Sequence, residues 1–236
     1  MKIVSDFSQN HSKKSRRKKD IKFIVIHYTG MQSEIESIKR LKNKKTKVSC
    51  HYLINRSGTI IKMVNEDKVA WHAGKSKWKN FVNLNKNSIG IELVNRGHAF
   101  GYESFSNSQI KSLINLCKKI KKKYKIKNQN FLGHSDIAPL RKKDPGEKFP
   151  WKKISKYGLG FWRDAEKKIL NSKDQNRILF FKNIHKIGYR YFNLKKRNKR
   201  KDKLVTIAFQ RRYNPNKVSG NIDKKTYILS HFLANH

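Results

Sequence analysis

Three residues that could carry out hydrolytic chemistry lie close together past the middle of the chain. His134, Lys142 and Asp144 fall within eleven positions of the segment Asn130–Trp151, NFLGHSDIAPLRKKDPGEKFPW. A short apolar run leads into the segment, and a loop rich in Pro and Gly follows. A strand end that presents an imidazole, followed by a rigid loop that returns a carboxylate and a lysine, is a common way to build part of a one-metal hydrolytic site. A further nitrogen ligand must come from elsewhere in the chain.

Two short apolar segments offer the missing groups. Lys22–Tyr28 (KFIVIHY) is rich in β-branched residues and predicts a buried strand with His27 at its C-terminal end. Ser88–Asn95 (SIGIELVN) predicts another strand, and it carries Glu92 between two apolar residues. A carboxylate facing a cleft would have a raised pKa, which suits a general base. On the solvent side of the strand the same residue would have no special role.

A catalytic zinc site follows if His27, His134 and Asp144 meet in space. Two imidazoles and one carboxylate leave a fourth tetrahedral position for water, and zinc lowers the pKa of that water toward ~7. Glu92 would then take the proton of the water and pass it to a leaving amine, and Lys142 would stabilise the oxyanion. Spacing alone does not show that these residues meet, because nine histidines could also be scattered by chance.

The elements that must position these residues are predicted from caps and periodicity. Ser33 begins a capping box (Ser-x-x-Glu) before a helix, and a second box opens an amphipathic helix over Ser106–Lys125. Ser49–Asn55 and Thr59–Val64 predict a hairpin around an Arg-Ser-Gly turn. A further helix is expected over Gly158–Leu170.

Other residues with possible roles are more ambiguous. The loop Trp71–Gly74 (WHAG) could equally line a ligand groove or pack against the core, and both interpretations stay open. Cys50 and His51 are neighbours on a predicted strand, so they point to opposite faces and cannot both bind one metal. Cys117 falls on the apolar face of its helix, and two cysteines do not make a disulfide framework.

The C-terminal part of the chain has a different pattern. Asn171–Gln175 (NSKDQ) is a polar linker, and the residues after it carry only helical periodicity. Three short helices are expected, with Asp223 as the N-cap of the last one. The apolar positions assigned to them are Ile178, Leu179, Ile184 and Ile187; Leu204, Ile207, Ala208 and Phe209; Tyr227, Ile228, Phe232 and Leu233.

The composition is strongly basic. Lys and Arg total 57 against 16 Asp and Glu, a net charge of +41, which predicts polyanionic partners or else a lysine-biased surface with no selected partner. The basic run at 13–19 is expected to be a solvated, mobile arm within residues 1–20. The N-terminus has no apolar segment typical of a signal peptide, and no stretch approaches the ~20 apolar residues of a membrane span. These features favour a cytoplasmic location.

Six motifs, in order, carry a resemblance to a known family. They are IVIHYTG (24–30), SCHYLINRSGTI (49–60), AWHAG (70–74), SIGIELVNRG (88–97), FLGHSDIAPLRKKDPGEKFPW (131–151) and LGFW (159–162). Together they resemble the AmpD/AmiD-type zinc N-acetylmuramoyl-L-alanine amidases (amidase type 2), relatives of the peptidoglycan recognition proteins. The resemblance implies an α/β (α+β) fold with a central mixed sheet flanked by helices. It also implies cleavage of the amide between N-acetylmuramic acid, anhydro or not, and L-alanine of the stem peptide.

The same resemblance assigns roles by position. His27, His134 and Asp144 correspond to the ligands of one zinc ion, Glu92 to the catalytic glutamate and Lys142 to the catalytic lysine. All five are present, which argues against a silent relative that only binds peptidoglycan. Substrate contacts are expected from Tyr28, His51 and His72, which lie in or near the same motifs.

The tail shows a second resemblance. Ala208–Leu233 (AFQRRYNPNKVSGNIDKKTYILSHFL) is similar to part of the three-helix peptidoglycan-binding domain of some amidases. This favours the AmiD-like branch, a catalytic domain over residues 21–170, a peptidoglycan-binding-like domain over 175–236, and a monomer acting on peptidoglycan or muropeptides. Because AmiD-like members are typically exported lipoproteins, the periplasm or cell envelope is the alternative location. A nucleic-acid-binding role, motivated only by charge, is the least favoured, because no nucleic-acid-binding motif is recognised.

Overall fold

The computed structural model describes residues 2–164 and 177–235 and contains a mixed six-stranded sheet. The sheet order is β1-β4-β3-β7-β2-β8, in which β3 and β4 pair antiparallel and the other neighbours pair parallel. The strands are β1 (Ile3–Ser5), β2 (Phe23–Tyr28), β3 (Tyr52–Ile54), β4 (Ile60–Lys62), β7 (Ser88–Leu93) and β8 (Phe131–Gly133), and β5 (Lys77–Trp78) and β6 (Phe81–Val82) form a separate ribbon. The expected mixed sheet is confirmed.

Along the central strands β2 and β7, successive side chains alternate between the two faces of the sheet. Ile24 and Ile26 of β2 belong to the core cluster that includes helix α2 (Asn107–Tyr124), whereas Val25 belongs to a second cluster. Side chains alternate between faces along a strand, so His27 lies on the face of Val25. His27 is paired in register with Glu92 of β7, and paired residues on neighbouring strands project to the same side.

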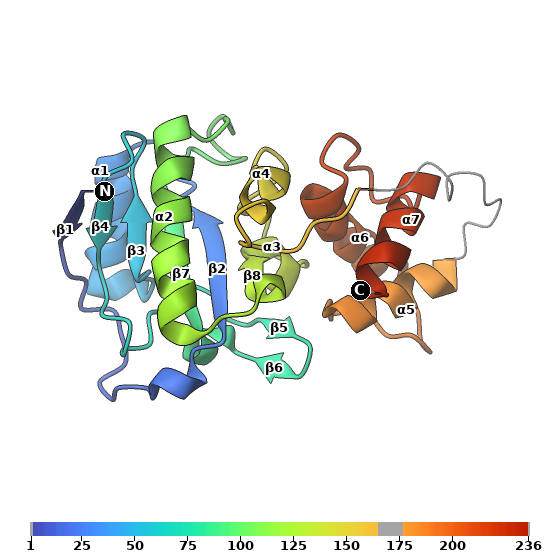
Figure 1. Cartoon of the computed structure of the whole chain (residues 1–236), viewed down its shortest axis with the longest axis horizontal. Helices are drawn as coiled ribbons and strands as arrows, with labels where there is room; N and C mark the ends of the chain where they lie inside the picture. Colours follow the sequence, from blue (N-terminus) through green and yellow to red (C-terminus); the bar gives the residue numbers. More distant parts are fainter. Residues whose placement is uncertain (1, 165–176, 236) are drawn as a thin grey trace.

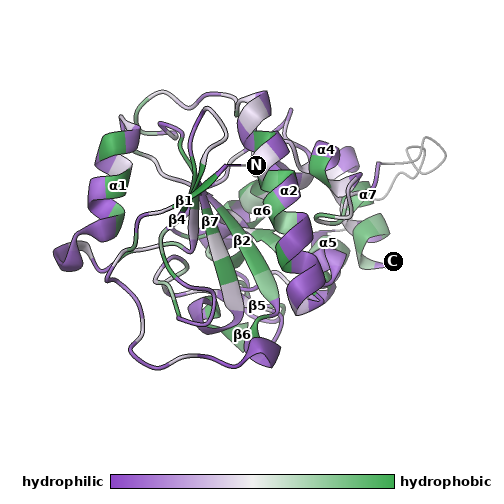
Figure 2. Ribbon diagram, turned by 60° about the vertical axis from the view of Figure 1, so that its left-hand side comes forward, coloured by the Kyte–Doolittle hydropathy of each residue, from purple (hydrophilic) through white to green (hydrophobic). Residues whose placement is uncertain are grey.

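Helices cover the two faces of the sheet (Figures 1 and 2). Helix α2 packs on one face, and α1 (Glu34–Lys42) lies on the other face, beside β3 and β4. The predicted capping box is present at α2, where Ser106 and Gln109 exchange bonds with each other's backbone N–H. Ser33 caps α1 by accepting a hydrogen bond from the backbone N–H of Glu36. The face opposite α2 is left partly open, and the site lies there.

Shorter elements complete the part of the chain that precedes the C-terminal helices. The predicted hairpin is confirmed by the pairing of β3 with β4 around the turn at Gly58, whose φ is +88°. Helices α3 (His134–Ile137) and α4 (Trp151–Ser155) follow β8. The helix expected over Gly158–Leu170 is wrong for residues 158–164, which form a turn and a bend followed by four residues without regular secondary structure, and its remainder lies outside the described residues. Short 3₁₀ turns occupy Lys18–Asp20, Lys44–Thr46, Leu84–Asn87 and Asn128–Asn130.

Three C-terminal helices pack beside α3 and α4 (Figure 1). They are α5 (Arg177–Ile187), α6 (Lys199–Tyr213) and α7 (Lys224–Ala234), and Asp223 caps α7 as expected. Their apolar side chains share one core cluster with Val25 of β2, Leu132 of β8 and Ile137 of α3. Within α5 the buried positions are Phe180, Phe181 and Ile184, whereas Ile178 is 62% exposed. The predicted linker Asn171–Gln175 lies outside the described residues.

The N-terminal segment is not the mobile arm that its composition predicts. Strand β1 pairs with β4, and the backbone of residues 6–16 continues along the segment 62–69. Arg16, in the basic run, donates hydrogen bonds to the carbonyls of Glu66, Asn85 and Ser88. Ser88 begins β7, so a partly buried role in anchoring the segment to the sheet explains this arginine better than contact with a polyanion. Within the described residues, no helix is long and apolar enough to cross a membrane.

Candidate active site

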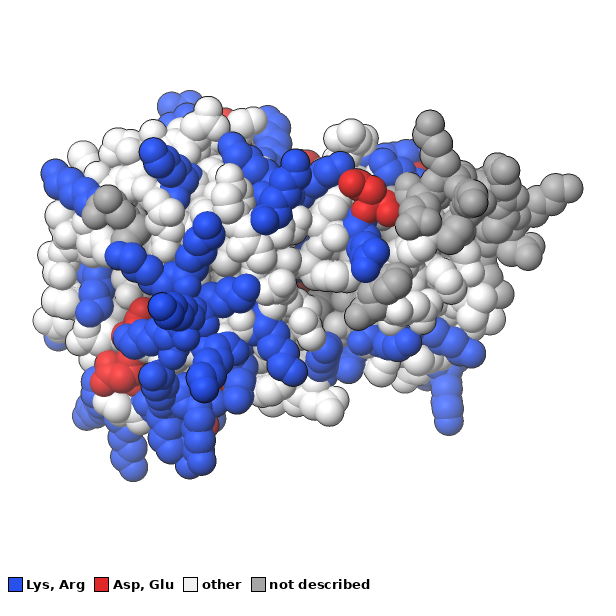
Figure 3. Space-filling view, in the orientation of Figure 1, with Lys and Arg blue, Asp and Glu red and all other residues white. Residues whose placement is uncertain are grey.

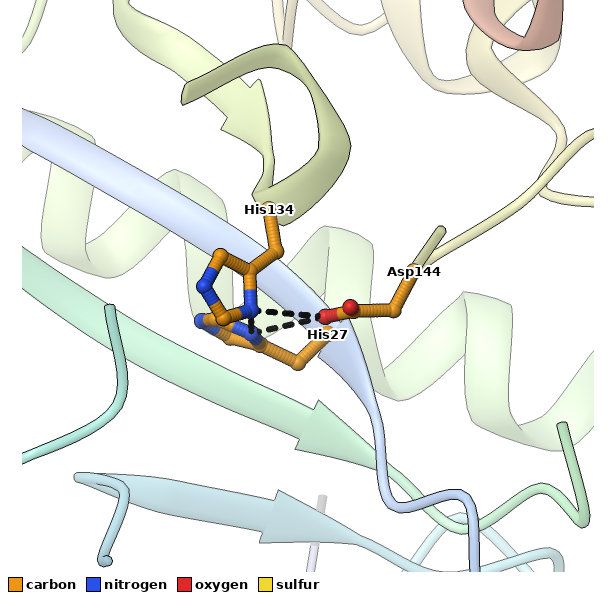
Figure 4. Close-up of side chains that lie close together, drawn as sticks. All are labelled: His27, His134 and Asp144. Atoms are coloured by element: carbon orange, nitrogen blue, oxygen red, sulfur yellow. Dashed lines mark hydrogen bonds and ion pairs between the residues drawn. The ribbon is translucent and has the colours of Figure 1, made fainter. Parts of the chain in front are cut away.

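Three side chains from separate segments converge at the C-terminal ends of β2 and β8 (Figure 4). His27 Nδ1 lies 2.9 Å from Asp144 Oδ2 and 3.0 Å from His134 Nδ1, and His134 Nδ1 lies 3.1 Å from the same carboxylate oxygen. His27 ends β2, His134 begins α3, and Asp144 comes from the loop that follows α3. All three side chains are buried. The residues that the sequence places 107 positions apart therefore do meet.

The donor set fits a single metal ion. The three candidate ligand atoms lie within 4.8 Å of one another. Tetrahedral bonds of ~2.0–2.1 Å to zinc would place ligand atoms about 3.3 Å apart, close to the distances found here. Burial lowers the pKa of His27 to about 4, which keeps its ring neutral and able to coordinate. Burial alone would raise the pKa of Asp144, but the neighbouring His134 and His27 hold it well below its usual range.

Hydrogen bonds behind the ligands fix the direction in which each ring points. His27 Nε2 lies 3.0 Å from His72 Nδ1, and His72 Nε2 lies 3.2 Å from Ser88 Oγ, which donates to the carbonyl of Leu84. On the second ligand, His134 Nε2 lies 3.1 Å from the carbonyl of Ala73. A carbonyl can only accept, so in both series the hydrogen bonds are donated in the direction away from the ligand, starting from the Nε2–H of His27 or His134. The Nδ1 of each ligand therefore keeps its lone pair, which faces the metal position.

His72 has a different position from the one expected of a substrate contact. It borders the cleft, but its ring is buried between His27 and Ser88, directly above Gly90. A Cβ atom on Gly90 would lie 2.3 Å from His72 Cγ, so only glycine leaves room for the ring at this point of β7. His51 is fully buried, accepts a hydrogen bond from the Gly90 N–H and does not line the cleft. Its position does not support the expected contact with substrate.

Glu92 lies beside His27 on the open face of the sheet. Its residue is half-buried and lines the cleft, while Oε2 is buried with no hydrogen-bond partner among the described residues. Burial, reinforced by the charge of Asp144, raises the pKa of Glu92 well above its usual range. The expectation that Glu92 faces a cleft with a raised pKa is met, and an unpaired carboxylate of this kind is suited to exchanging a proton with a ligand.

The cleft that contains these groups has a volume of about 730 Å³. Lys142 lines it together with three further cations, Arg40, Arg141 and Lys143. Tyr28 also lines the cleft, and its hydroxyl lies 2.9 Å from His98 Nδ1. Tyr28 and Lys142 are therefore placed where the sequence predicts them, at the open side of the ligand cluster.

Sequence reasoning left several cleft residues without a role. Arg141 lines the cleft and donates to the carbonyl of Ala73, the same carbonyl that holds His134. His98 borders the cleft between Tyr28 and Glu147. Trp71 lines the cleft, whereas Ala73 is buried in the core, so the WHAG loop has both roles that were left open. The only signal available for Arg141 was its place one residue before Lys142.

Comparison with known proteins identifies the family. The N-acetylmuramoyl-L-alanine amidase family profile matches residues 17–147. N-acetylmuramoyl-L-alanine amidase AmiD of Escherichia coli is 35% identical over 229 residues, covering 90% of this chain and 82% of the relative. The chain belongs to the N-acetylmuramoyl-L-alanine amidase family. 1,6-Anhydro-N-acetylmuramyl-L-alanine amidase AmpD of Haemophilus influenzae is 34% identical over 161 residues, covering 61% of this chain and 85% of the relative.

Solved structures of this amidase family share the whole architecture. A complex of Escherichia coli AmiD with anhydro-N-acetylmuramic acid-L-Ala-D-γ-Glu-L-Lys matches with a TM-score of 0.83 and 33% identity, covering 95% of this chain and 91% of that one. AmpDh3 of Pseudomonas aeruginosa, in complex with anhydromuramic pentapeptide, matches with a TM-score of 0.81 and 30% identity, covering 90% and 91%. The broad coverage by AmiD, including the C-terminal helices, confirms the predicted AmiD-like branch.

Proposed function

We propose that the chain is a zinc enzyme that hydrolyses the amide between N-acetylmuramic acid and L-alanine of peptidoglycan stem peptides. The observation that carries the proposal is the convergence of His27, His134 and Asp144 beside the unpaired carboxylate of Glu92, in a chain of the amidase family. The AmiD and AmpDh3 complexes hold anhydromuramyl peptides, so the same class of muropeptide is the proposed substrate here.

The proposed mechanism follows from the positions of the side chains. His27, His134 and Asp144 would hold the zinc ion, which supplies Lewis-acid chemistry when bound. Glu92 takes a proton from the attacking water and delivers it to the departing nitrogen of L-alanine, a task that suits a carboxylate with a raised pKa. Lys142, on the rim of the same cleft, stabilises the negative charge that develops on the carbonyl oxygen.

The charge of the cleft suits an acidic peptide. Four cationic side chains line it, and the γ-linked glutamate of the ligand bound by AmiD leaves a free α-carboxylate. Lys and Arg also cover much of the surface shown in Figure 3, where Asp and Glu are sparse. Attraction between this surface and anionic wall material would raise the rate of encounter and weaken with salt.

The division of labour within the chain is part of the proposal. Residues 21–170 would form the catalytic domain, and residues 175–236, with helices α5 to α7, a peptidoglycan-binding-like domain. Whether the chain acts as a monomer, and in the cytoplasm or at the cell envelope, stays a prediction.

The central experiment compares two substrates. Purified chain is incubated with intact sacculi and, separately, with soluble anhydromuropeptides, and the release of free stem peptide is measured with and without a chelator. Cleavage that disappears on chelation and returns with zinc supports the proposal. Activity that survives complete metal removal contradicts the mechanism. A Glu92→Gln variant that binds zinc but has lost at least 10²-fold in turnover would support the general-base role.

A silent, peptidoglycan-binding protein would behave differently in the same assay. It would sediment with sacculi and bind zinc, yet release no stem peptide. Glu92→Gln would then leave the only measurable activity, sedimentation, unchanged.

A further inference from the structure

A buried carboxylate two residues after His134 takes two of its partners from the C-terminal part of the chain. Asp136 is 1% exposed, and its Oδ2 accepts a hydrogen bond from the backbone N–H of Gly133, which closes the turn that begins α3. Its remaining partners are Arg212 of α6, which donates to Oδ2, and Tyr189, whose hydroxyl donates to Oδ1 over 2.6 Å. The turn that presents His134 is thus held by a charge pair and a hydrogen bond from outside the catalytic half.

Arg212 also binds the strand that leads into this turn. Its Nη2 donates to the carbonyl of Phe131 in β8 over 2.9 Å, and its guanidinium stacks on Trp151 at 4.1 Å. The arginine side chain is 3% exposed, so the ion pair with Asp136 is almost completely removed from water. A module that only tethered the enzyme to its substrate would not need to bury a cation inside the neighbouring half.

The consequence of losing this arginine follows from electrostatics. Asp136 would stay buried without a counter-charge, and a buried, unpaired carboxylate is strongly unfavourable. The turn would have to open to bring the carboxylate to water. This opening would move the start of α3, where His134 is attached, away from His27 and Asp144.

We propose that the C-terminal helices are a structural part of the amidase centre, with Arg212 and Tyr189 acting as positioning residues that hold Asp136 and so keep His134 in place. This inference rests on the proposed role of His134 as a zinc ligand. It assigns α6 and the segment after α5 a function beyond any contact with peptidoglycan.

Zinc affinity of the full-length chain tests the proposal. Arg212→Met is expected to weaken zinc binding by roughly 10–100-fold, the range found when groups behind metal ligands are removed. Tyr189→Phe, which deletes only a hydroxyl, should weaken it by a few-fold. Affinity is measured by competition with a chromogenic chelator, and the folded state is checked by circular dichroism of the zinc-free protein.

Matched substitutions control for general effects. Arg200→Met makes the same change on an exposed part of α6, and Tyr227→Phe makes the same change on α7. Both are expected to bind zinc as the wild type does. If Arg212→Met lowers the melting temperature but the folded variant keeps wild-type zinc affinity, the helices only stabilise the fold and the proposal is overturned.

A double variant keeps the test valid if Arg212→Met does not fold. Asp136→Asn combined with Arg212→Met removes both charges, and the amide oxygen can still accept from Gly133. Zinc affinity about 10-fold below wild type is expected for the folded double variant, because Arg212 no longer holds the turn or the carbonyl of Phe131. Wild-type zinc affinity in the folded double variant would contradict the proposal. A wild type that binds zinc tightly but cleaves nothing would refute the proposed function alone, whereas a wild type that binds no zinc would refute both.

Discussion

Hydrogen bonds that end on backbone carbonyls orient the rings of His27 and His134, so that the Nδ1 lone pair of each faces the metal position. The series His27–His72–Ser88 ends at the carbonyl of Leu84, and His134 ends directly at Ala73. Each series ends at a carbonyl, which can only accept, so the direction of every hydrogen bond before it, and with it the tautomer of each ligand, is determined by the fold. Histidine ligands are commonly held in this way, and the group behind the ligand contributes measurably to metal affinity.

Replacement of His72 tests this arrangement. His72→Ala should weaken zinc binding by roughly 10–100-fold, because the His27 ring loses the acceptor for its Nε2–H. Gly90→Ala should weaken it too, because the new methyl group would displace the His72 ring. Chelator competition provides the measurement, with the exposed His231→Ala as a control. The double variant should lose less zinc affinity than the two single losses added together, because the methyl group of Gly90→Ala has no ring to displace once His72 is alanine. Additive losses would contradict this account.

Glu92 should make stability depend on pH in zinc-free protein. Its pKa is raised by burial, so the folded protein keeps this proton above pH 4.5, where the unfolded chain loses it. Stability therefore falls as pH rises from the unfolded pKa to the folded one, and then levels off. Glu92→Gln lacks this pH dependence. The free energy of unfolding of the variant, relative to that of the wild type, should therefore rise by about 1.4 kcal/mol per pH unit over that window. Urea unfolding at several pH values measures it; a difference that is constant with pH would refute the raised pKa.

At the scale of elements, the basic run near the N-terminus contains two arginines with opposite roles. Arg16 donates to four carbonyls and is partly buried, whereas the side chain of Arg17 is 72% exposed and pairs with Asp20. Burial lowers the pKa of Arg16 to about 10, which still leaves it charged at neutral pH. The segment is thus fastened to the base of the sheet by one residue of the run.

A matched pair of substitutions measures this fastening. Arg16→Met should destabilise the fold by about 2–4 kcal/mol, because the carbonyls of Glu66, Asn85 and Ser88 lose their charged donor. Arg17→Met should cause no measurable change, because an exposed ion pair contributes little. Urea denaturation of both variants gives the comparison. Equal midpoints for the two variants would show that the segment is as loosely attached as its composition predicts.

The elements differ in how far the sequence could predict them. Strands β2 and β7 are short, apolar and β-branched, and the caps Ser33, Ser106 and Asp223 are local signals, so these predictions are confirmed. The position of His72 depends on the empty space above Gly90, a tertiary feature with no local pattern. The same limit applies to α5, where periodicity could not decide between the face of Ile178 and the face of Phe181.

Contacts between residues far apart in the sequence explain why the remaining features could not be predicted. Arg16 could not be told from its basic neighbours because its partners lie 35 to 72 positions away. Asp136 and Arg212 are separated by 76 positions, and no sequence pattern in either segment predicts that they pair. The ligand set was accessible because its residues lie within motifs shared with a known family, and the structure then shows that they converge.

At the scale of the molecule, the two halves share one apolar interior. Phe209 of α6 is fully buried, packs edge-on against Phe180 and Tyr189, and belongs to the same cluster as Val25 and Leu132 of the sheet. The ion pair between Asp136 and Arg212 crosses the same boundary. Neither half can therefore unfold without exposing apolar surface and a buried charge of the other.

This sharing predicts a single cooperative unfolding transition for the full chain. Calorimetry of zinc-free protein should give one peak, with equal calorimetric and van't Hoff enthalpies. Phe209→Ala should lower stability by about 3–5 kcal/mol and shift that one peak intact, whereas Phe7→Ala, which removes a ring from a residue that is 51% exposed, should hardly move it. Zinc is left out because a ligand that binds only the folded state would raise the transition by mass action. Two resolved peaks, with only one sensitive to Phe209→Ala, would show that the C-terminal helices unfold independently and that the amidase centre does not depend on them for stability.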